Sequence, residues 1–394
     1  MADMHGSDRF AALRERCAAG RDAVIAELRR LADERGSHVS DLHALLLDYP
    51  LRPAKALRPT LCLSVAGALG ADHAAALPSA AALELLHNAF LIHDDVEDGS
   101  ETRRGAATLH ELHGVSTAVN VADGMFALSL YPLLDNCEHL GVGAALEVLE
   151  TIADTVRITV EGQALELAWI RDNTWTFPTD YRDAYIDLVI RKTAHYSFVA
   201  PVTIGCIIAG AAPKVRDALV RYARHIGVAF QITDDVLNLA ADGDAYGKER
   251  DGDLWEGKRT LILLHAIAHE TCAATHTRAL EILARPRPST GGARLARLTA
   301  TLARLHAERR VPDDAHAALL AALGPDTPTK QPADIAFLRD LIDRHASLAA
   351  ARAVAVAECT AAAEILDSVA GALEAGSARQ FLRDLVPYVM DRLQ

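Results

Sequence analysis

The chain has 394 residues, with 53 acidic against 40 basic side chains and a formal net charge of −13. This acidic balance argues against a nucleic-acid partner, because phosphate backbones need a basic surface, and it fits a protein that gathers cations. Hydrophobic residues make up 51% of the chain and aromatic residues only 5%, and the many alanines and leucines favour helices over strands.

Amphipathic helices account for most of the predicted secondary structure. Apolar residues recur at three-to-four spacing over five long segments, which are residues 12–32, 80–98, 144–171, 181–208 and 213–239. Breaks are predicted at residues 51–53, 173–178 and 242–244, and no alternating run longer than four residues predicts a strand. We therefore predict an all-α fold, a large helical bundle around a central active-site cavity.

The last third of the chain is more elaborate than the rest. Residues 285–292 and 324–332 are rich in Pro, Gly and Thr, which predicts surface loops or a partly mobile insertion. They bracket a helical piece that does not look like a separate domain. We therefore predict a single domain over residues 1–394, with a motif-bearing core at about 40–270 and an elaborated helical part at about 271–394.

The cysteine pattern and the N-terminal sequence indicate a reducing compartment. The six cysteines are scattered without a CxxC pair, and the N-terminal residues lack the apolar segment of a secretory signal. We therefore expect a cytoplasmic protein. Residues 194–212 are apolar enough to suggest a membrane span, but they include His195, Pro201 and Thr203, which favours a buried core helix.

An acidic cluster ends the apolar segment 83–92. Asp94 and Asp98 are one helical turn apart on a shared face, with Asp95 beside them. Three carboxylates at a helix C-terminus repel one another and meet the negative end of the helix dipole. A hard divalent cation would offset this cost, because Mg²⁺ prefers carboxylate oxygens and bridges to substrate phosphates. The alternative is a solvated acidic helix end.

Two arginines, Arg103 and Arg104, follow this cluster directly and precede a glycine. Arginine forks match phosphate oxygens in a bidentate manner, so acid, metal, phosphate and arginine can form one site. An arginine pair alone is more often surface charge, and its place after the aspartates makes it informative here.

A second acidic cluster, Asp234-Asp235, ends another apolar helix and has Asn238 at the third position. The amide oxygen of Asn238 can hydrogen-bond a metal-bound water, although it contributes no charge. Gly247-Lys248 and Gly257-Lys258 follow, and flexible glycines beside lysines suit a loop that folds over a diphosphate. Two such helix ends facing one cavity would hold several Mg²⁺ ions around a pyrophosphate.

These motifs closely resemble the trans-prenyl diphosphate synthase family, the polyprenyl synthetases. The resemblance runs from about residue 55 to residue 260, with a family-like ending at residues 381–392. It rests on the order of the motifs: Lys-x-x-Arg-Pro, Asp-Asp-x-x-Asp, Arg-Arg-Gly, Lys-Thr, Phe-Gln, a second Asp-Asp and Gly-Lys-x-Thr. The usual Gly-Lys-Arg-x-Arg-Pro is here Ala54-Lys55-Ala56-Leu57-Arg58-Pro59, without the glycine and one arginine.

The resemblance implies a role for each matching residue. It implies two metal-binding sets, Asp94, Asp95 and Asp98 in one and Asp234, Asp235 and Asn238 in the other. It implies a site for isopentenyl diphosphate at Lys55, Arg58, His87 and Arg104. It implies contacts to the allylic diphosphate from Arg103, Lys192 and Lys258, a lid lysine at Lys248, and polar groups near the reacting carbons at Thr193 and Gln231.

The function implied by the resemblance is the Mg²⁺-dependent condensation of isopentenyl diphosphate with an allylic diphosphate, by an enzyme that is commonly a homodimer. A terpene cyclase or atypical prenyltransferase on the same fold, and a non-catalytic subunit, are the alternatives. The retained second diphosphate site favours elongation over the first alternative, and the intact aspartate sets disfavour the second.

Two residues bear on product length. Phe90 and Ala89 lie about one turn before Asp94, where a growing prenyl tail would begin, unless Phe90 belongs simply to the core. An aromatic ring beside a small residue predicts a short product, geranylgeranyl diphosphate first and farnesyl diphosphate second.

Overall fold

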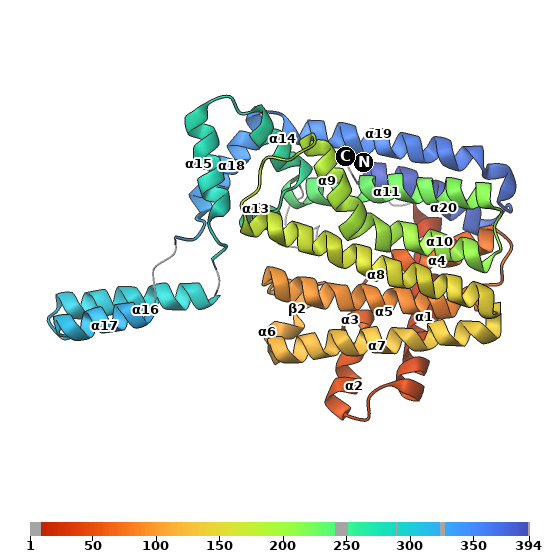
Figure 1. Ribbon diagram of the computed structural model, residues 1–394, viewed down its shortest axis with the longest axis horizontal. Helices are drawn as coiled ribbons and strands as arrows, with labels where there is room; N and C mark the ends of the chain where they lie inside the picture. The colour runs from red at the N-terminus through yellow and green to blue at the C-terminus, as the bar shows by residue number, and fades with distance from the viewer. Residues whose placement is uncertain (1–8, 241–250, 289, 324–327, 393–394) are drawn as a thin grey trace, which may run out of the picture.

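The computed structural model describes residues 9–240, 251–288, 290–323 and 328–392 (Figure 1). It confirms the all-α prediction, and the strands among these residues are only β1 (Thr102–Arg103) and β2 (Ala106–Ala107), which pair antiparallel. The helices are α1 (Ala11–Arg35), α2 (Ser40–Leu46), α3 (Asp48–Leu51), α4 (Leu57–Ala68), α5 (His73–Asp98), α6 (Leu109–His113), α7 (Val115–Leu140), α8 (Val142–Arg171), α9 (Tyr181–Val189), η1 (Ile190–Val199), α10 (Ala200–Ile208), α11 (Pro213–Ala240), α13 (Gly252–Glu256), α14 (Leu261–His269), α15 (Ala273–Ala284), α16 (Thr290–Ala307), α17 (Asp313–Leu323), α18 (Pro332–Arg344), α19 (Ser347–Ser368), η2 (Ala370–Ala372) and α20 (Ser377–Asp391).

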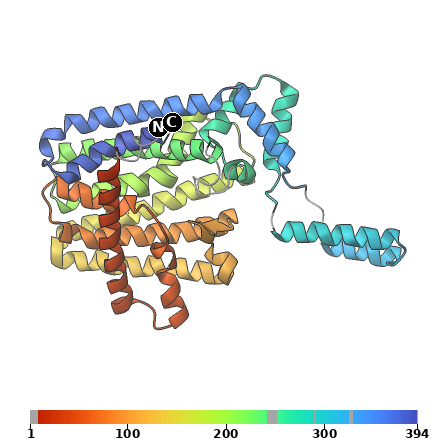
Figure 2. The same cartoon turned by 180° about the vertical axis from the view of Figure 1, so that it is seen from behind.

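The long helices lie side by side in one bundle, and α1 crosses them on one face (Figure 2). Helix α5 packs against α7 on one side and α4 on the other, whereas α11 packs against α19 and η1. Helices α5 and α11 are the two that end in the aspartate clusters. The five predicted helical segments correspond to α1, α5, α8, the continuous run α9–η1–α10, and α11. The predicted break at residues 242–244 lies outside the described residues.

Local sequence features fix both ends of α5. Its N-cap Asp72 accepts a hydrogen bond from the backbone N–H of Ala74 at 3.2 Å, which satisfies one of the free donors of the first turn. Its C-cap Gly99 has φ of +61°, a left-handed conformation that glycine adopts without strain. The chain therefore turns sharply after Asp98, and the Arg103–Arg104 hairpin folds back towards the same helix end.

The segment that carries Lys192 is π-helical and packs very tightly against α8. A Cβ atom at Gly162 would lie 2.7 Å from the Cα of Lys192 and 2.8 Å from the carbonyl carbon of Arg191. Only a glycine permits such a close approach of two backbones. π-Helical turns frequently occur at functional sites, and this one presents Lys192 and Thr193 to the cavity described below.

The elaborated C-terminal part contains a helical hairpin that projects from the bundle. Helices α16 and α17 pack on each other and extend away from the remaining helices (Figures 1 and 2). Helix α16 begins at Thr290, so the loop predicted at residues 285–292 is shorter than expected. The predicted loop at residues 324–332 lies partly outside the described residues, and α18 begins at Pro332.

The apolar stretch at residues 194–212 includes the end of η1 and all of α10, and seven of the nine residues of α10 are buried, as a core helix requires. Among the described residues, α5 and α7 are long and apolar enough to cross a membrane by length and composition alone. The apolar window of α5 is 78% buried within the bundle, whereas that of α7 is 44% buried. Helix α7 therefore exposes an apolar face, which includes Leu130 and Leu134.

Candidate active site

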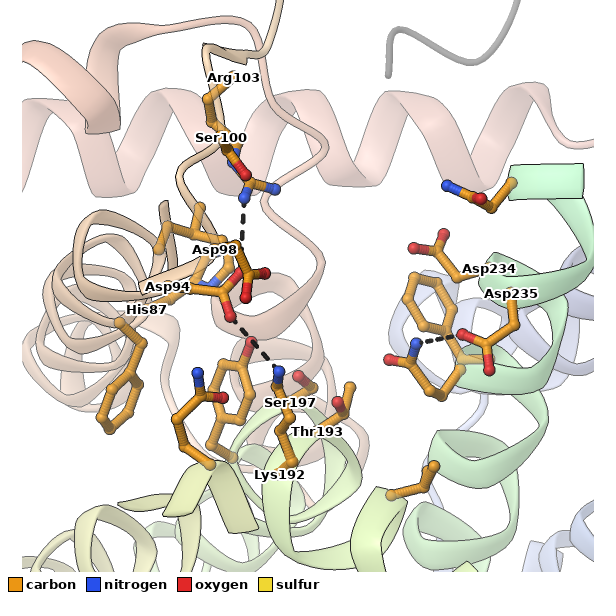
Figure 3. Close-up of a pocket in the computed structure, with 18 of the residues that line it drawn as sticks. His87, Asp94, Asp98, Ser100, Arg103, Lys192, Thr193, Ser197, Asp234 and Asp235 are labelled. Atoms are coloured by element: carbon orange, nitrogen blue, oxygen red, sulfur yellow. Dashed lines mark hydrogen bonds and ion pairs between the residues drawn. The ribbon is translucent and has the colours of Figure 1, made fainter. Parts of the chain in front are cut away.

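A large cavity lies between α5, α8, η1 and α11 and has a volume of about 1590 Å³. Asp94 and Asp98 reach it from one side, and Asp234 and Asp235 from the opposite side (Figure 3). The two aspartate clusters, 136 or more residues apart in the chain, therefore face each other across one cavity.

In the first cluster, the carboxylates of Asp94 and Asp98 are held by lysines. The Nζ atom of Lys192 lies 3.4 Å from Oδ1 of Asp94, and that of Lys258 lies 2.9 Å from Oδ2 of Asp98. Burial raises the pKa of Asp98 to about 7, and the nearby charge of Lys258 opposes this shift. A buried carboxylate of this kind needs a cation beside it to remain ionised.

Asp95 turns away from the cavity, although it is adjacent to Asp94 in the chain. It is fully buried, accepts a hydrogen bond from the hydroxyl of Tyr49 at 2.6 Å, and is paired with the guanidinium of Arg103. Burial is the main cause that raises the pKa of Asp95, and these two partners counteract it. The geometry makes Asp95 the residue that orients Arg103, which itself lines the cavity.

In the second cluster, Asp235 is fixed by neighbouring side chains. Its carboxylate accepts hydrogen bonds from the Tyr185 hydroxyl and from Nε2 of Gln231, both at 2.7 Å. Burial raises the pKa of Asp235 to about 7, and the two hydrogen bonds limit the rise. Asp234 faces the cavity more openly and is 3.1 Å from the guanidinium of Arg392, which comes from the C-terminal end of the chain.

Asn238 serves a local structural role in this arrangement. Its side-chain oxygen accepts a hydrogen bond from the backbone N–H of Asp253 at 3.2 Å, and its backbone oxygen accepts one from Asp251 at 3.1 Å. These bonds tie the end of α11 to α13, which precedes Lys258. Gly257, with φ of +74°, then turns the chain so that Lys258 points into the cavity.

A cationic pocket lies beside the first cluster. The ring Nε2 of His87 is 3.0 Å from Arg58 and 3.4 Å from Arg104. Burial, followed by the charges of these arginines, lowers the pKa of His87 well below its usual value, so the ring is neutral and accepts from them. Arg58 also donates to the hydroxyls of Tyr196 and Ser197, at 3.0 and 3.1 Å, so its guanidinium is firmly placed. Among the residues that the structure describes, no carboxylate is paired with Arg58 or Arg104, so the two guanidinium groups favour binding of an anion in this pocket.

The structure therefore brings nearly all described site candidates to one cavity. Lys55 lies at its exposed rim with its Nζ 5.5 Å from the ring centre of Tyr388, and Thr193, Phe90 and Gln231 line its wall. Ala89 does not line it, because the side chain of this α5 residue is fully buried in the core. Lys248 lies outside the described residues.

Sequence reasoning missed several residues of the site. Glu166 is buried in the cavity wall and forms an ion pair with Lys192. The only hint in the sequence is its place between Leu165 and Leu167. No local pattern marks Tyr49 or Tyr185, whose hydroxyls bind the second aspartate of each pair from distant segments. The contact of Arg392 with Asp234 likewise arises only from tertiary structure.

The carboxylates of this cavity suit a hard divalent cation. Within the described ranges, no three His, Cys, Asp or Glu side chains converge closely enough to hold a metal ion unaided. Asp94, Asp98 and Asp234 nevertheless offer carboxylate oxygens to the same space, and Mg²⁺ usually takes one or two carboxylates and completes its shell with water and phosphate oxygens. The residues present therefore fit Mg²⁺ that arrives with a diphosphate.

The fold and the two opposed aspartate clusters define an isoprenoid synthase fold. The family described as polyprenyl synthetase matches residues 41–294. A (2E,6E)-farnesyl diphosphate synthase from Mycobacterium bovis is 36% identical over 257 residues, covering 63% of this chain and 68% of the relative. The octaprenyl diphosphate synthase of Escherichia coli is 36% identical over 217 residues, covering 55% and 63%.

Among solved structures, a polyprenyl synthase from Caulobacter crescentus complexed with calcium and isoprenyl diphosphate is 26% identical with a TM-score of 0.72, and 99% of each chain is covered. The chain belongs to the polyprenyl synthetase family and is a prenyltransferase. The two relatives are named as synthases of products of different lengths, farnesyl and octaprenyl diphosphate.

Proposed function

We propose that the protein condenses isopentenyl diphosphate with an allylic prenyl diphosphate, with Mg²⁺, and releases a short-chain trans-prenyl diphosphate. The observation that carries the proposal is the presence of two separate clusters of basic side chains on one cavity. One contains Arg58, His87 and Arg104, and the other contains Lys192 and Lys258 beside the aspartates. An enzyme that only ionises a single diphosphate has no need of the first of these two clusters.

The proposed reaction begins at the aspartate side of the cavity. Arg103, Lys192 and Lys258 bind the allylic diphosphate through charge-assisted hydrogen bonds, and Asp94, Asp98 and Asp234 would hold Mg²⁺. Mg²⁺, when bound, neutralises charge on the leaving diphosphate. The allylic C–O bond then breaks, and its electron pair leaves with the pyrophosphate.

The acceptor is held by Arg58 and Arg104, with neutral His87 between them. Its double bond attacks the allylic cation, and the proton lost from the adjacent carbon passes to the departing pyrophosphate, so no protein base is required. Apolar side chains exclude water from the cation, among them Leu91, Val156 and Leu188 on the cavity wall.

Purified protein incubated with labelled isopentenyl diphosphate and each allylic primer tests this proposal. We expect label in an elongated prenyl diphosphate, and only when Mg²⁺ is present. Consumption of the allylic diphosphate without incorporation of label would instead indicate a cyclase or an atypical prenyltransferase. No turnover of any primer would indicate a non-catalytic subunit.

We further propose geranylgeranyl diphosphate as the main product, with farnesyl diphosphate as the alternative. Phe90 lies on the cavity wall, and its ring packs edge-on against Phe126 and Tyr196, with centroids 5.3 and 5.5 Å away. The rings of Phe90 on α5, Phe126 on α7 and Tyr196 on η1 narrow the cavity about one helical turn before Asp94. The prenyl tail would grow into this part of the cavity. We assign the length-limiting role to Phe90 and not to Ala89, which is buried behind the wall.

Phe90→Ala tests this assignment. Removing the ring opens space for additional isoprene units, so longer products should appear while ionisation continues. Chromatography of the dephosphorylated products measures the distribution, with Phe177→Ala, outside the cavity lining, as the control. An unchanged distribution in Phe90→Ala would place the end of the tunnel elsewhere.

We also propose that the protein is a cytoplasmic homodimer joined through α7 and α8. Large apolar side chains are exposed along these two helices, namely Val115, Leu130, Tyr131 and Leu134 on α7 and Val142, Leu146 and Val160 on α8. Exposed apolar side chains gathered on two neighbouring helices favour a protein interface. Sedimentation should show a dimer that Leu134→Glu dissociates, whereas Leu319→Glu, at an exposed position on the projecting hairpin, should not dissociate it.

A further inference from the structure

The chain segment that leaves the bundle for the projecting hairpin passes directly beside the cavity. Residues 285–288 lead out and residues 328–331 lead back, and the backbone N–H of Lys330 donates to the carbonyl of Pro286 at 3.0 Å. Arg285 is paired with Asp334 at 2.8 Å, which fixes this base to α18. The base is therefore a defined structure, and not a loose connection.

One residue of this base, Arg287, lines the cavity. Its Nη1 lies 3.3 Å from Oε1 of Glu256, and the other oxygen of Glu256 lies 2.8 Å from Nζ of Lys258. Lys258 in turn lies 2.9 Å from Asp98. Positive and negative groups therefore alternate in a row of four, from Arg287 at the hairpin base to Asp98 at the proposed metal site.

The backbone around Glu256 is pinned on both sides, so its side chain is the movable part. The Nζ of Lys330, which is almost fully buried, donates to the carbonyl of Trp255 at 2.9 Å. Arg259, also buried, donates to the carbonyl of Gly257 and to Oδ1 of Asn173. The position of the Glu256 carboxylate is therefore set by its two cationic partners, Arg287 and Lys258.

We infer that Arg287 is a positioning residue that holds Glu256 and so frees Lys258 for the allylic diphosphate. This inference rests on the proposed role of Lys258. When Asp98 turns to the metal, Glu256 is the carboxylate that stays in contact with Lys258. Without a second cation, Glu256 would draw the ammonium group towards itself and away from the substrate. Arg287 also forms an ion pair with Glu256, and this second pair weakens the attraction between Glu256 and Lys258.

A double-mutant cycle tests the inference through the Michaelis constant for the allylic diphosphate, measured with the most active primer. Arg287→Gln should raise this constant roughly tenfold, the effect of one charge-assisted hydrogen bond, with little change in the constant for isopentenyl diphosphate. Arg287→Lys should retain most of the wild-type value. In the Glu256→Gln background, Arg287→Gln should hardly change the Michaelis constant further, because the negative charge of Glu256 that Arg287 balances has already been removed.

Two controls make the outcome specific. Arg285→Gln removes an ion pair from the same base without touching Glu256, so an equal rise in that variant would show general loosening and overturn the inference. A tenfold effect of Arg287→Gln that persists with Glu256→Gln would also overturn it, since it would show direct contact of Arg287 with substrate. Thermal unfolding of each variant verifies folding.

Lys258→Gln distinguishes a failure of this inference from a failure of the proposed role of Lys258, on which the inference rests. If Lys258→Gln leaves the constant for the allylic diphosphate unchanged, the role proposed for Lys258 is wrong and the inference fails with it. If Lys258→Gln raises the constant and Arg287→Gln does not, the inference alone is wrong and the function of Lys258 stands.

Discussion

Gly162 is the contact point between α8 and the π-helical segment, and Gly162→Ala should displace the segment that carries Lys192 and Thr193. The added Cβ would lie 2.7 Å from the Cα of Lys192, whereas ordinary contacts begin at 3.4 Å. The clash is with backbone, which cannot rotate away, so the two helices must separate by about 0.7 Å or more. Overpacking of this kind costs about 1–3 kcal/mol of stability.

The Gly162→Ala protein should lose activity even where it remains folded. A shift of about 1 Å in a catalytic group can lower the rate by about a hundredfold, so we expect a decrease in kcat of roughly 10- to 100-fold in protein that remains folded. Steady-state kinetics and thermal unfolding measure the two effects.

Gly143→Ala is the matched control on the same helix, because nothing lies within 4 Å of a Cβ at that position. It should leave activity unchanged and stability equal or higher by up to about 1 kcal/mol. Gly162→Ala protein with a wild-type kcat would refute the reasoning.

Three further expectations concern the aspartates, the two substrates and a buried lysine. Asp94→Ala and Asp234→Ala should each lower Mg²⁺-dependent turnover by about two to three orders of magnitude in a product assay, and near-normal rates in either would contradict the metal assignment. Arg58→Ala should mainly raise the Michaelis constant for isopentenyl diphosphate and Lys192→Ala that for the allylic diphosphate; an increase for the same substrate in both variants would show that the sites are wrongly assigned. Burial, reinforced by the charge of Arg259, lowers the pKa of Lys330 from 10.5 to about 8, so between these values the unfolded chain binds a proton that the folded chain lacks. The contribution of Lys330 to the unfolding free energy therefore rises as pH increases from 8 towards 10.5, by at most about 3 kcal/mol, and the difference between wild type and Lys330→Met in denaturant titrations should follow that rise.

The helices and the two aspartate clusters could be predicted because their signals are local. The spacing of Asp94 and Asp98 places them on one helix face in any fold that keeps the helix. The break after Asp98 is likewise encoded by Gly99, which ends α5 in a left-handed conformation. The expectation that both clusters serve one cavity rested on the family resemblance, which depends on the order of the motifs. No local pattern in the sequence says which helices lie across the cavity from each other.

The direction of individual side chains within the clusters could not be predicted. Asp95 is drawn inward by Tyr49, 46 residues earlier in the chain, and by Arg103 after the turn. Asn238 is occupied by the backbone of Asp253 from the following helix. Such partners are brought together only by tertiary packing, and the same holds for the hairpin base that places Arg287 on the cavity wall.

Three carboxylates of the cavity are each paired with a basic side chain, and two of these cations, Lys192 and Lys258, are proposed to bind the substrate as well. Lys192 is paired with Asp94, Lys258 with Asp98, and Arg392 lies 3.1 Å from Asp234. Mg²⁺ at these aspartates would displace the basic side chains from their carboxylate partners. A buried cation without a partner raises the free energy of the protein, unless an anion takes the place of the lost carboxylate. A diphosphate restores that balance.

Binding of Mg²⁺ and of diphosphate should therefore be strongly coupled, and the coupling must be reciprocal. Calorimetric titration of Mg²⁺ with and without inorganic pyrophosphate should show at least about a tenfold gain in metal affinity when pyrophosphate is bound, corrected for complexation in solution. Lys258→Gln removes one displaced cation and should weaken this coupling. Equal metal affinities in the two titrations would contradict the exchange of partners, because the lysines would then remain with their aspartates.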